Sequence, residues 1–471
     1  MLFTALSFGK VSKLKENLLM KKENGYIRFE GEKDAAFDFC EGYKAFLNTA
    51  KTEREFVTET VKAAQAQGFK PLGSAPLKKG DKVYSVNRGK GILLAVIGSE
   101  PIESGLSIVG AHIDSPRLDL KQNPLYEDSD IAFLKTHYYG GIKKYQWTAI
   151  PLAMHGTVIL ADGTSRQIAI GDEGDDITFT ISDILPHLAD DQYKKSLKEA
   201  IEGENLNIIV GSVPVRDDEK NSVKLAVLQY LNDKYSMTEE DFISAEIELV
   251  PAFSLKDLGF DRGLIAGPAQ DDRVCSYAAL KAIFDIKNPS RTAVCLLVDK
   301  EEIGSMGNTG MESRFFENTV LEIAALMGEI TPLTLARVLS ASQCLSADVN
   351  AGFDPNFASP YEKNNSAYLS YGVSVTKYTG ARGKAGSSDA SAEFVGEIRR
   401  LFNENGVLWQ TGELGKVDAG GGGTIAQYVA NLNIDTIDCG TPLLSMHSPF
   451  EVSSKMDVYM TYKGYKVFFE R

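Results

Sequence analysis

The chain has 471 residues, of which 43% are hydrophobic and 24% are charged, and its formal net charge at pH 7 is −14. A single hydrophobic core stops growing well below this length, so we expect two domains. The excess of negative charge argues against binding to nucleic-acid phosphates or to an anionic membrane surface. No run approaches about 18 uninterrupted apolar residues, and we therefore expect no membrane-spanning segment.

The cysteines are scattered, and none belongs to a CxxC pair. Several lie in apolar stretches, which is typical of buried, reduced thiols and not of a disulfide framework or a zinc knuckle. This usage indicates a cytoplasmic protein. The cysteines are Cys40, Cys275, Cys295, Cys344 and Cys439.

The first part of the chain reads as helices alternating with strands. Thr52–Glu55 has the pattern of a capping box and begins a helix that we expect to run toward Gly68. Lys82–Asn87 and Ile92–Ile97 are expected to pair as a hairpin. The second of these runs is apolar throughout, which predicts an interior strand.

A short apolar strand is then expected to end at His112, with Asp114 two residues further on. A histidine at a strand end is usually structural. An aspartate this close, however, can orient an imidazole through its second nitrogen, which is common behind metal ligands. Both a structural role and a metal-binding role are open for His112 at this point.

The character of the sequence changes between Leu118 and Pro251. Alternating segments separated by Gly, Asp and Thr turns predict antiparallel β-structure. We therefore expect an inserted, mostly β domain here. The predicted division is 1–117 and 253–471 for the two parts of one domain, and 118–252 for the inserted domain.

The α/β pattern then resumes. Asp271 and Asp272 precede an apolar helix, where acids can simply favour the helix N-terminus. Ala293–Val298 is continuously apolar, as expected for a strand buried on both faces, and Glu301 and Glu302 follow it. Adjacent carboxylates at such a strand end repel each other unless positive charge lies beside them.

Two later strands also end in polar groups. Cys344–Ala347 is expected to lead to Asp348, and Thr436–Gly440 is followed by His447. Between them, Gly420–Thr424 is a glycine run that precedes a helix. It lacks the lysine and the spacing of a phosphate loop, so close approach of the backbone to a substrate is the better interpretation. These patterns together predict an α/β fold with a mixed, largely parallel sheet flanked by helices.

These polar side chains can converge because a parallel sheet gathers the C-terminal ends of its strands along one edge. Two histidines and three carboxylates, one of them bridging, suit a pair of divalent metal ions with a shared water. No cysteine is well placed to ligate, which favours zinc, cobalt or manganese. The alternative is a set of ordinary polar residues at strand ends. The candidate metal ligands are His112, Asp271, Glu302, Asp348 and His447.

Five sequence blocks carry a resemblance to a known family. In order they are GAHIDSPRLDLK, AQDDRVCSYAAL, VDKEEIGSMGNTG, SADVNAGFDPN and MHSPFEV. They resemble the aspartyl aminopeptidase family of dinuclear zinc metallopeptidases. The resemblance extends over nearly the whole chain and is densest around these blocks. It implies a zinc-peptidase-like catalytic domain and an inserted β-rich domain that serves as a dimerisation and lid element.

The resemblance also implies how the metal ligands are shared. His112 and Asp348 would bind one metal ion, Glu302 and His447 would bind the other, and Asp271 would bridge both.

Two further residues take catalytic roles in this resemblance. Glu301 would be the general base that deprotonates the water bridging the metal ions, and Asp114 would orient His112. The peptide bond between Asp271 and Asp272 would be cis, as in similar enzymes.

The resemblance further implies that the protein is a homo-oligomer. Family members assemble as dimers and, from these, as tetrahedral dodecamers, and the inserted domain covers the neighbouring active site. His187 lies in Ile184–Leu188, which is similar to the stretch from which a histidine reaches into the partner's site.

This chain departs from the family's pattern at Asp354, where better-known members have a histidine before Pro-Asn. If that histidine recognises an acidic substrate side chain, an aspartate in its place would repel it. Arg382 and Lys384 are nearby in the sequence, either as anion partners or as solvated loop cations. The candidate substrate-binding residues are His187, Asp354, Arg382, Lys384, Gly423 and Thr424.

We therefore predict a dinuclear metalloaminopeptidase that removes N-terminal residues, with Asp and Glu as candidates, from short peptides with a free N-terminus. Two alternatives stay open. One is a metal-dependent carboxypeptidase or N-deacylase of similar layout, which would accept amine-blocked substrates. The other is an inactive oligomeric scaffold, which the presence of Glu301 and all five candidate ligands disfavours.

Overall fold

The computed structural model describes residues 18–20, 22–215 and 220–471. Its largest sheet has nine strands, and five of the eight neighbouring pairs are parallel. The predicted mixed, largely parallel sheet is thus confirmed. In spatial order the strands are β1 (Lys70–Pro71), β2 (Lys82–Asn87), β3 (Gly91–Val96), β13 (Thr292–Val298), β4 (Leu106–His112), β14 (Gln343–Ser346), β18 (Asp435–Gly440), β16 (Val373–Thr376) and β17 (Trp409–Thr411).

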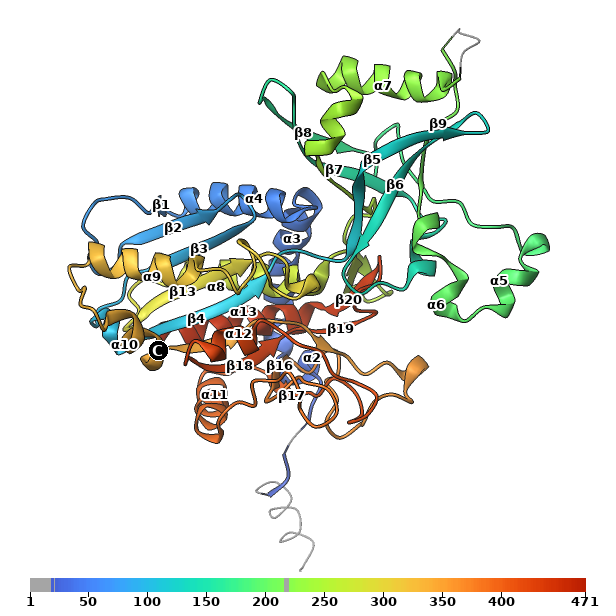
Figure 1. The fold of residues 1–471 in the computed structure, drawn as a ribbon. Helices are drawn as coiled ribbons and strands as arrows, with labels where there is room; N and C mark the ends of the chain where they lie inside the picture. The colour runs from blue at the N-terminus through green and yellow to red at the C-terminus, as the bar shows by residue number, and fades with distance from the viewer. Residues whose placement is uncertain (1–17, 21, 216–219) are drawn as a thin grey trace, which may run out of the picture.

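The interior strands are buried on both faces. Alternate residues of β13 enter two different cores, with Cys295 and Leu297 in one and Val294 and Leu296 in the other. This follows from the period of two along a strand. The first core is covered by α3 (Lys33–Thr49), α4 (Glu53–Ala66), α8 (Gln270–Asp285), α11 (Ala392–Glu404) and α13 (Lys455–Glu470); the second is covered by α9 (Phe315–Leu326), α10 (Thr334–Ala341) and α12 (Ala426–Asn431) (Figure 1).

Local signals in the sequence are reproduced in the structure. The Thr52 hydroxyl accepts from the backbone N–H of Glu55, and the Glu55 carboxylate accepts from the backbone of Thr52, which completes the predicted capping box of α4. The predicted hairpin is present as the antiparallel pair β2–β3. All five cysteines lie in the described part of the chain, and all are buried and free of disulfides.

A small five-stranded sheet lies beside the large one and supports the C-terminal part of the chain. It brings together segments that are almost 200 residues apart, because β12 pairs with β20. Its strands, in spatial order, are β11 (Lys256–Leu258), β12 (Leu264–Gly267), β20 (Glu451–Ser454), β19 (Pro442–Leu444) and β15 (Asn350–Ala351).

The segment between β4 and β11 forms a separate six-stranded sheet, antiparallel throughout (Figure 1). It has its own apolar core, which is drawn from Leu118 to Leu249 and includes residues of α7 (Ser222–Tyr235). Short helices α5 (Asp190–Lys194) and α6 (Leu197–Ala200) lie to one side. The strands, in spatial order, are β8 (Ser165–Ile170), β7 (Leu152–Ile159), β10 (Glu246–Pro251), β5 (Arg117–Asp128), β6 (Ile131–Tyr139) and β9 (Ile208–Gly211).

In the described part of the chain, none of the helices combines the length and the apolarity that crossing a membrane requires.

Candidate metal centre

The five side chains predicted as metal ligands meet at one edge of the large sheet. Strands β13, β4 and β14 are neighbours and parallel, so their C-terminal ends lie side by side. The loops that follow these strands supply part of the cluster, and the start of α8 after β12 and the turn between β19 and β20 supply the rest. Its members are His112 at the end of β4, Asp271 in the first turn of α8, Glu302 after β13, Asp348 after β14 and His447 before β20.

Asp271 is the centre of the cluster. Its two carboxylate oxygens face different imidazoles: Oδ1 is 3.3 Å from Nε2 of His112, and Oδ2 is 3.2 Å from Nε2 of His447. Nε2 of His447 also lies 3.5 Å from Oε2 of Glu302, and Nε2 of His112 lies 3.9 Å from Oε2 of Glu301. The predicted cis peptide between Asp271 and Asp272 is present.

Each imidazole is oriented by a hydrogen bond at its other nitrogen. Nδ1 of His112 lies 3.1 Å from the carbonyl oxygen of Asp114, and Nδ1 of His447 lies 3.0 Å from the carbonyl oxygen of Gly141. Carbonyl oxygens only accept, so both Nδ1 atoms donate. This arrangement turns both Nε2 atoms toward the cluster, where a neutral imidazole would present the lone pair that metal ligation needs.

The donor set fits divalent cations. Ligand atoms of His112, Asp271 and Glu302 all lie within 4.8 Å of one another, and so do those of His112, Glu301 and Asp348. Oε1 of Glu302 is buried and has no hydrogen-bond partner among the described residues. Imidazole nitrogens with carboxylate oxygens form the coordination set that zinc and similar ions accept.

The shifted pKa values of the cluster also favour bound cations. Burial, followed by repulsion from neighbouring acids, raises the pKa of both Glu302 and Asp348 well above the ordinary range. Burial also raises the pKa of Glu301 to about 7, where it is opposed by attraction to His112. In contrast, although burial lowers it, hydrogen bonding to Asp271 raises the pKa of His447 to about 11. The site therefore holds extra positive charge, either as protons or as metal ions.

Two buried carboxylates fix the backbone beneath the cluster. Asp114 accepts from the backbone N–H groups of Glu301 at 3.1 Å and Glu302 at 3.2 Å. Its Oδ1 is also 3.3 Å from Nδ1 of His112, in agreement with the predicted orienting role. Although burial opposes it, hydrogen bonding to His112 holds the pKa of Asp114 below its ordinary value.

The second of these carboxylates is Glu451, which fixes the backbone of the segments that carry Asp271 and His447. Glu451 was not singled out from the sequence. Its Oε1 accepts from the backbone N–H of His447 at 2.7 Å. Its Oε2 accepts from those of Gln270 at 2.7 Å and Asp271 at 3.1 Å. The available signal was its place in the block MHSPFEV, where an acid begins a short strand four residues after His447.

A cavity of about 460 Å³ opens beside the cluster. Two of the candidate substrate-binding residues, Gly423 and Thr424, line it. The hydroxyl of Thr424 donates to buried Asp438 at 2.7 Å, which fixes the glycine run against β18. Other lining residues include Val349, Asn350, Thr379, Leu414, Gln427 and Met446.

The remaining substrate-binding candidates do not line this cavity. Asp354 is partly exposed and accepts from the backbone N–H of Asn356. Lys384 pairs with Asp389 at 2.9 Å and lies over the ring of Tyr378. Arg382 and His187 are exposed, the latter in the short helix Pro186–Leu188.

A sheet edge that gathers two imidazoles and four carboxylates around a cavity defines a metal-dependent hydrolase. The chain belongs to the M18 peptidase family: the family profile described as "Aminopeptidase I zinc metalloprotease (M18)" matches residues 46–469. It is therefore a metal-dependent aminopeptidase, a hydrolase that acts on peptides.

Known relatives are similar over almost their full length. The "Probable M18 family aminopeptidase 1" of Clostridium acetobutylicum is 50% identical over 459 residues, which cover 96% of this chain and 99% of that protein. The crystal structure of the M18 aminopeptidase from Thermotoga maritima superimposes with a TM-score of 0.93 at 46% identity and covers 96% of this chain and 99% of that one. A structure of an S. cerevisiae mApe1 dodecamer, at 21% identity and a TM-score of 0.74, covers 94% of this chain and 97% of that one and shares the fold.

Proposed function

We propose that the enzyme uses two divalent metal ions, with zinc as the expected metal and cobalt or manganese as substitutes. One observation carries this proposal: the two oxygens of Asp271 face Nε2 atoms of two different histidines, at 3.3 and 3.2 Å. A bridging carboxylate between two metal ions needs this geometry. Asp348 would complete the site at His112, and Glu302 would complete the site at His447.

In this proposal Glu301 is the general base. The metal ions, when bound, supply an acidified water and polarise the scissile carbonyl. The Glu301 carboxylate lines the cavity, and its Oε2 lies within 4 Å of Nε2 of His112. Glu301 therefore lies beside a proposed metal ligand, where it can accept the proton of the attacking water. It then returns that proton to the nitrogen of the leaving amine. The acidic edge attracts the substrate's α-ammonium group, which confines cleavage to the N-terminal residue.

The cavity favours neutral N-terminal residues over Asp or Glu. Among the described residues that line it there is no lysine or arginine. Lys384, one of the candidate cations named from the sequence, is paired with Asp389 instead. The cavity lining combines apolar side chains such as Leu414 and Met446 with neutral polar ones such as Asn350. An acidic substrate side chain would find no lysine or arginine among these lining residues to pair with.

The test is a panel of Leu-, Met-, Asp-, Glu- and Lys-p-nitroanilides with protein stripped of metal and reloaded with zinc, cobalt or manganese. We expect metal-dependent cleavage, with Leu and Met preferred over Asp and Glu by at least about tenfold. Preference for Asp or Glu would refute the neutral-pocket proposal. Cleavage of N-acetylated substrates alone would instead support the N-deacylase alternative.

We also propose that residues 118–252 act as the domain that pairs subunits into dimers and then a dodecamer. The separate core of this segment supports its independence. Oligomerisation is supported by the fold shared with the yeast dodecamer. The exposed position of His187 leaves it available to a partner's site. Analytical ultracentrifugation tests the assembly. The buried, unpaired cysteines support the expected cytoplasmic location.

A further inference from the structure

A short segment of the six-stranded sheet lies directly on the metal centre. This segment is Tyr139–Gly141, at the end of β6, and we refer to it as the strap. The hydroxyl of Tyr139 donates to Oδ2 of Asp114 at 2.9 Å. The carbonyl oxygen of Gly141 accepts from Nδ1 of His447 at 3.0 Å. The strap thus touches both halves of the cluster from outside the large sheet.

The strap has little room for larger residues where it crosses the cluster. A Cβ atom at Gly140, whose φ is +77°, would lie 3.3 Å from both Cβ and Oε2 of Glu302. A Cβ atom at Gly141 would lie 3.3 Å from Nδ1 of His447. Close approach of this kind is a common reason for a glycine. The two glycines allow the strap to approach the proposed ligands closely.

The Tyr139 hydroxyl completes the hydrogen bonding of Asp114. The other donors to this carboxylate are the backbone N–H groups of Glu301 and Glu302, and Nδ1 of His112 lies 3.3 Å from its Oδ1. All of these belong to the loops of the metal centre itself. Tyr139 is thus the donor that ties the carboxylate to a different sheet.

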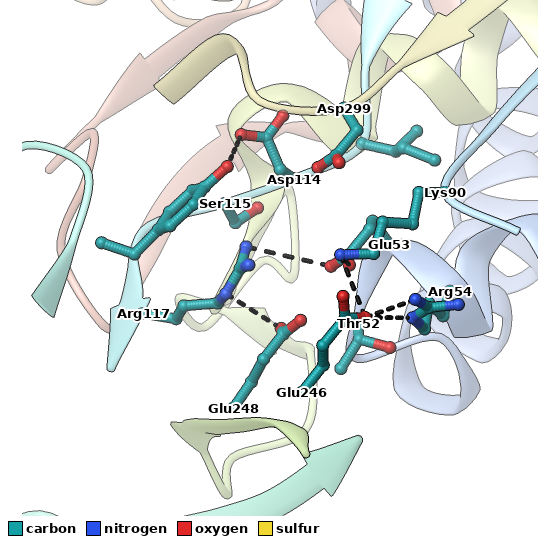
Figure 2. Close-up of polar contacts among 12 residues, drawn as sticks. Thr52, Glu53, Arg54, Lys90, Asp114, Ser115, Arg117, Glu246, Glu248 and Asp299 are labelled. Atoms are coloured by element: carbon teal, nitrogen blue, oxygen red, sulfur yellow. Dashed lines mark hydrogen bonds and ion pairs between the residues drawn. The ribbon is translucent and has the colours of Figure 1, made fainter. Parts of the chain in front are cut away.

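The tyrosine ring is itself held in place. The guanidinium of Arg117 lies 3.8 Å from the centre of the ring, and Tyr139 is buried. Arg117 is fixed in turn by Glu248, whose Oε2 lies 3.2 Å from its Nε (Figure 2). A donor with so little freedom can restrict the rotation of the carboxylate to which it binds.

We propose that Tyr139 is a positioning residue for catalysis. Through Asp114 it holds the backbone of Glu301 and Glu302, and therefore the proposed general base and one proposed metal ligand, in register with His112. This inference rests on the roles proposed above for Glu301 and the metal ligands. It makes the inserted segment part of the catalytic machinery as well as a candidate for subunit pairing.

The test compares Y139F with Y138F in the full-length, metal-loaded enzyme. Tyr138 is the adjacent residue on β6, is 43% exposed, and is a matched control for the loss of one phenolic hydroxyl. We expect Y139F to lower kcat for Leu-p-nitroanilide about tenfold with KM changed less than twofold. Because oriented ligands bind metal better, its affinity for Co²⁺ should fall about tenfold, read from the cobalt absorption spectrum. Y138F should match the wild type in both.

Circular dichroism and E301Q separate the possible outcomes. If kcat of Y139F falls only as much as its folded fraction, Tyr139 is merely structural and the inference is overturned. Wild-type kcat and Co²⁺ affinity in Y139F would overturn it as well. If E301Q keeps the wild-type kcat, the proposed function fails instead, while the Co²⁺ affinity of Y139F still decides whether Tyr139 organises the site.

Discussion

Two regions of the molecule bury several carboxylates, and they balance the charge differently. At the metal centre, none of the four clustered carboxylates forms an ion pair with a lysine or arginine in the described part of the chain; their partners there are histidines. The other region is the junction between α4, the turn after β2 and the six-stranded sheet. There, the buried acids face arginine and lysine side chains (Figure 2).

The junction is balanced by its own side chains. Nη1 of Arg117 lies 3.8 Å from Glu53 and its Nε lies 3.2 Å from Glu248, while Lys90 pairs with Glu246 at 3.1 Å. Although burial opposes it, Arg117 lowers the pKa of Glu53 to about 2. Burial, followed by repulsion from Glu53, raises the pKa of Glu248, although attraction to Arg117 opposes this. The junction thus supplies its own positive charge, whereas the acids of the metal centre are left for histidines and the proposed metal ions to balance.

The largest expected effect comes from removing the proposed general base at the metal centre. Glu301→Gln removes the proposed base but keeps an oxygen that can contact metal, so we expect metal content to stay at the wild-type level and kcat to fall at least about 100-fold. The matched control is Glu312→Gln, in the same loop but exposed, which should retain the wild-type kcat. Turnover and metal content by atomic absorption decide the matter; wild-type turnover in Glu301→Gln would remove it from the mechanism.

The next prediction concerns removal of the buried arginine at the junction. Arg117→Met leaves Glu248 buried without its cation and Glu53 with Lys90 alone, and breaking a buried pair from one side costs about 3–5 kcal/mol. Urea unfolding measures this loss. The control is Lys194→Met, which removes one partner of an exposed pair with Asp191 and should cost less than about 0.5 kcal/mol. Equal costs for the two variants would mean that the junction is no more important to stability than a surface pair.

Removal of metal tests how much the proposed metal ions contribute to the free energy of unfolding. Ligand binding to the folded state adds about 3–4 kcal/mol at free-metal concentrations of 100 to 1,000 times Kd. We therefore expect chelation to lower the free energy of unfolding by about this amount at pH 7.5, and zinc to restore it. Lys194→Met should lose a similar increment on chelation, because it alters only an exposed pair with Asp191. A chelated protein as stable as the loaded one would contradict the metal assignment.

Most residues of the proposed metal centre could be predicted from the sequence, but few of the residues that surround it could. His112, Glu301, Glu302 and Asp348 follow the ends of neighbouring parallel strands, which a parallel sheet brings together, whereas Asp271 and His447 come from segments next to the five-stranded sheet. Glu451 and Tyr139 were missed because their partners, Asp271 and Asp114, lie on other elements, and one of these contacts links residues 180 positions apart. No local pattern records such a contact.

The substrate-binding residues were harder still. Asp354 and Lys384 lie in loops, where side chains choose among several nearby partners, and here each is engaged locally, Asp354 with Asn356 and Lys384 with Asp389. The fold class was more accessible, because apolar runs such as Ala293–Val298 can be buried on both faces only inside a covered sheet.

The smallest expected effect concerns a histidine at the junction. His155 on β7 is buried between two acids: Nδ1 lies 2.8 Å from Glu55 on α4, and Nε2 lies 3.2 Å from Asp172. Although burial lowers it, hydrogen bonding to Asp172 and Glu55 raises the pKa of His155 to about 9. In the unfolded chain it would titrate near 6.5.

The sign of the pH dependence follows from these two values. A raised pKa in the folded state stabilises the protein fully below pH 6.5, and this contribution disappears as the pH rises through 9. We expect its loss to cost about 2–3 kcal/mol between pH 6.5 and 9.5. His155→Gln should flatten that part of the urea-unfolding curve against pH, whereas replacement of exposed His137 by Gln should leave it unchanged. Unlike the metal centre, the junction would then respond to alkaline pH through a single imidazole, and a wild-type slope in His155→Gln would assign the pH response to another group.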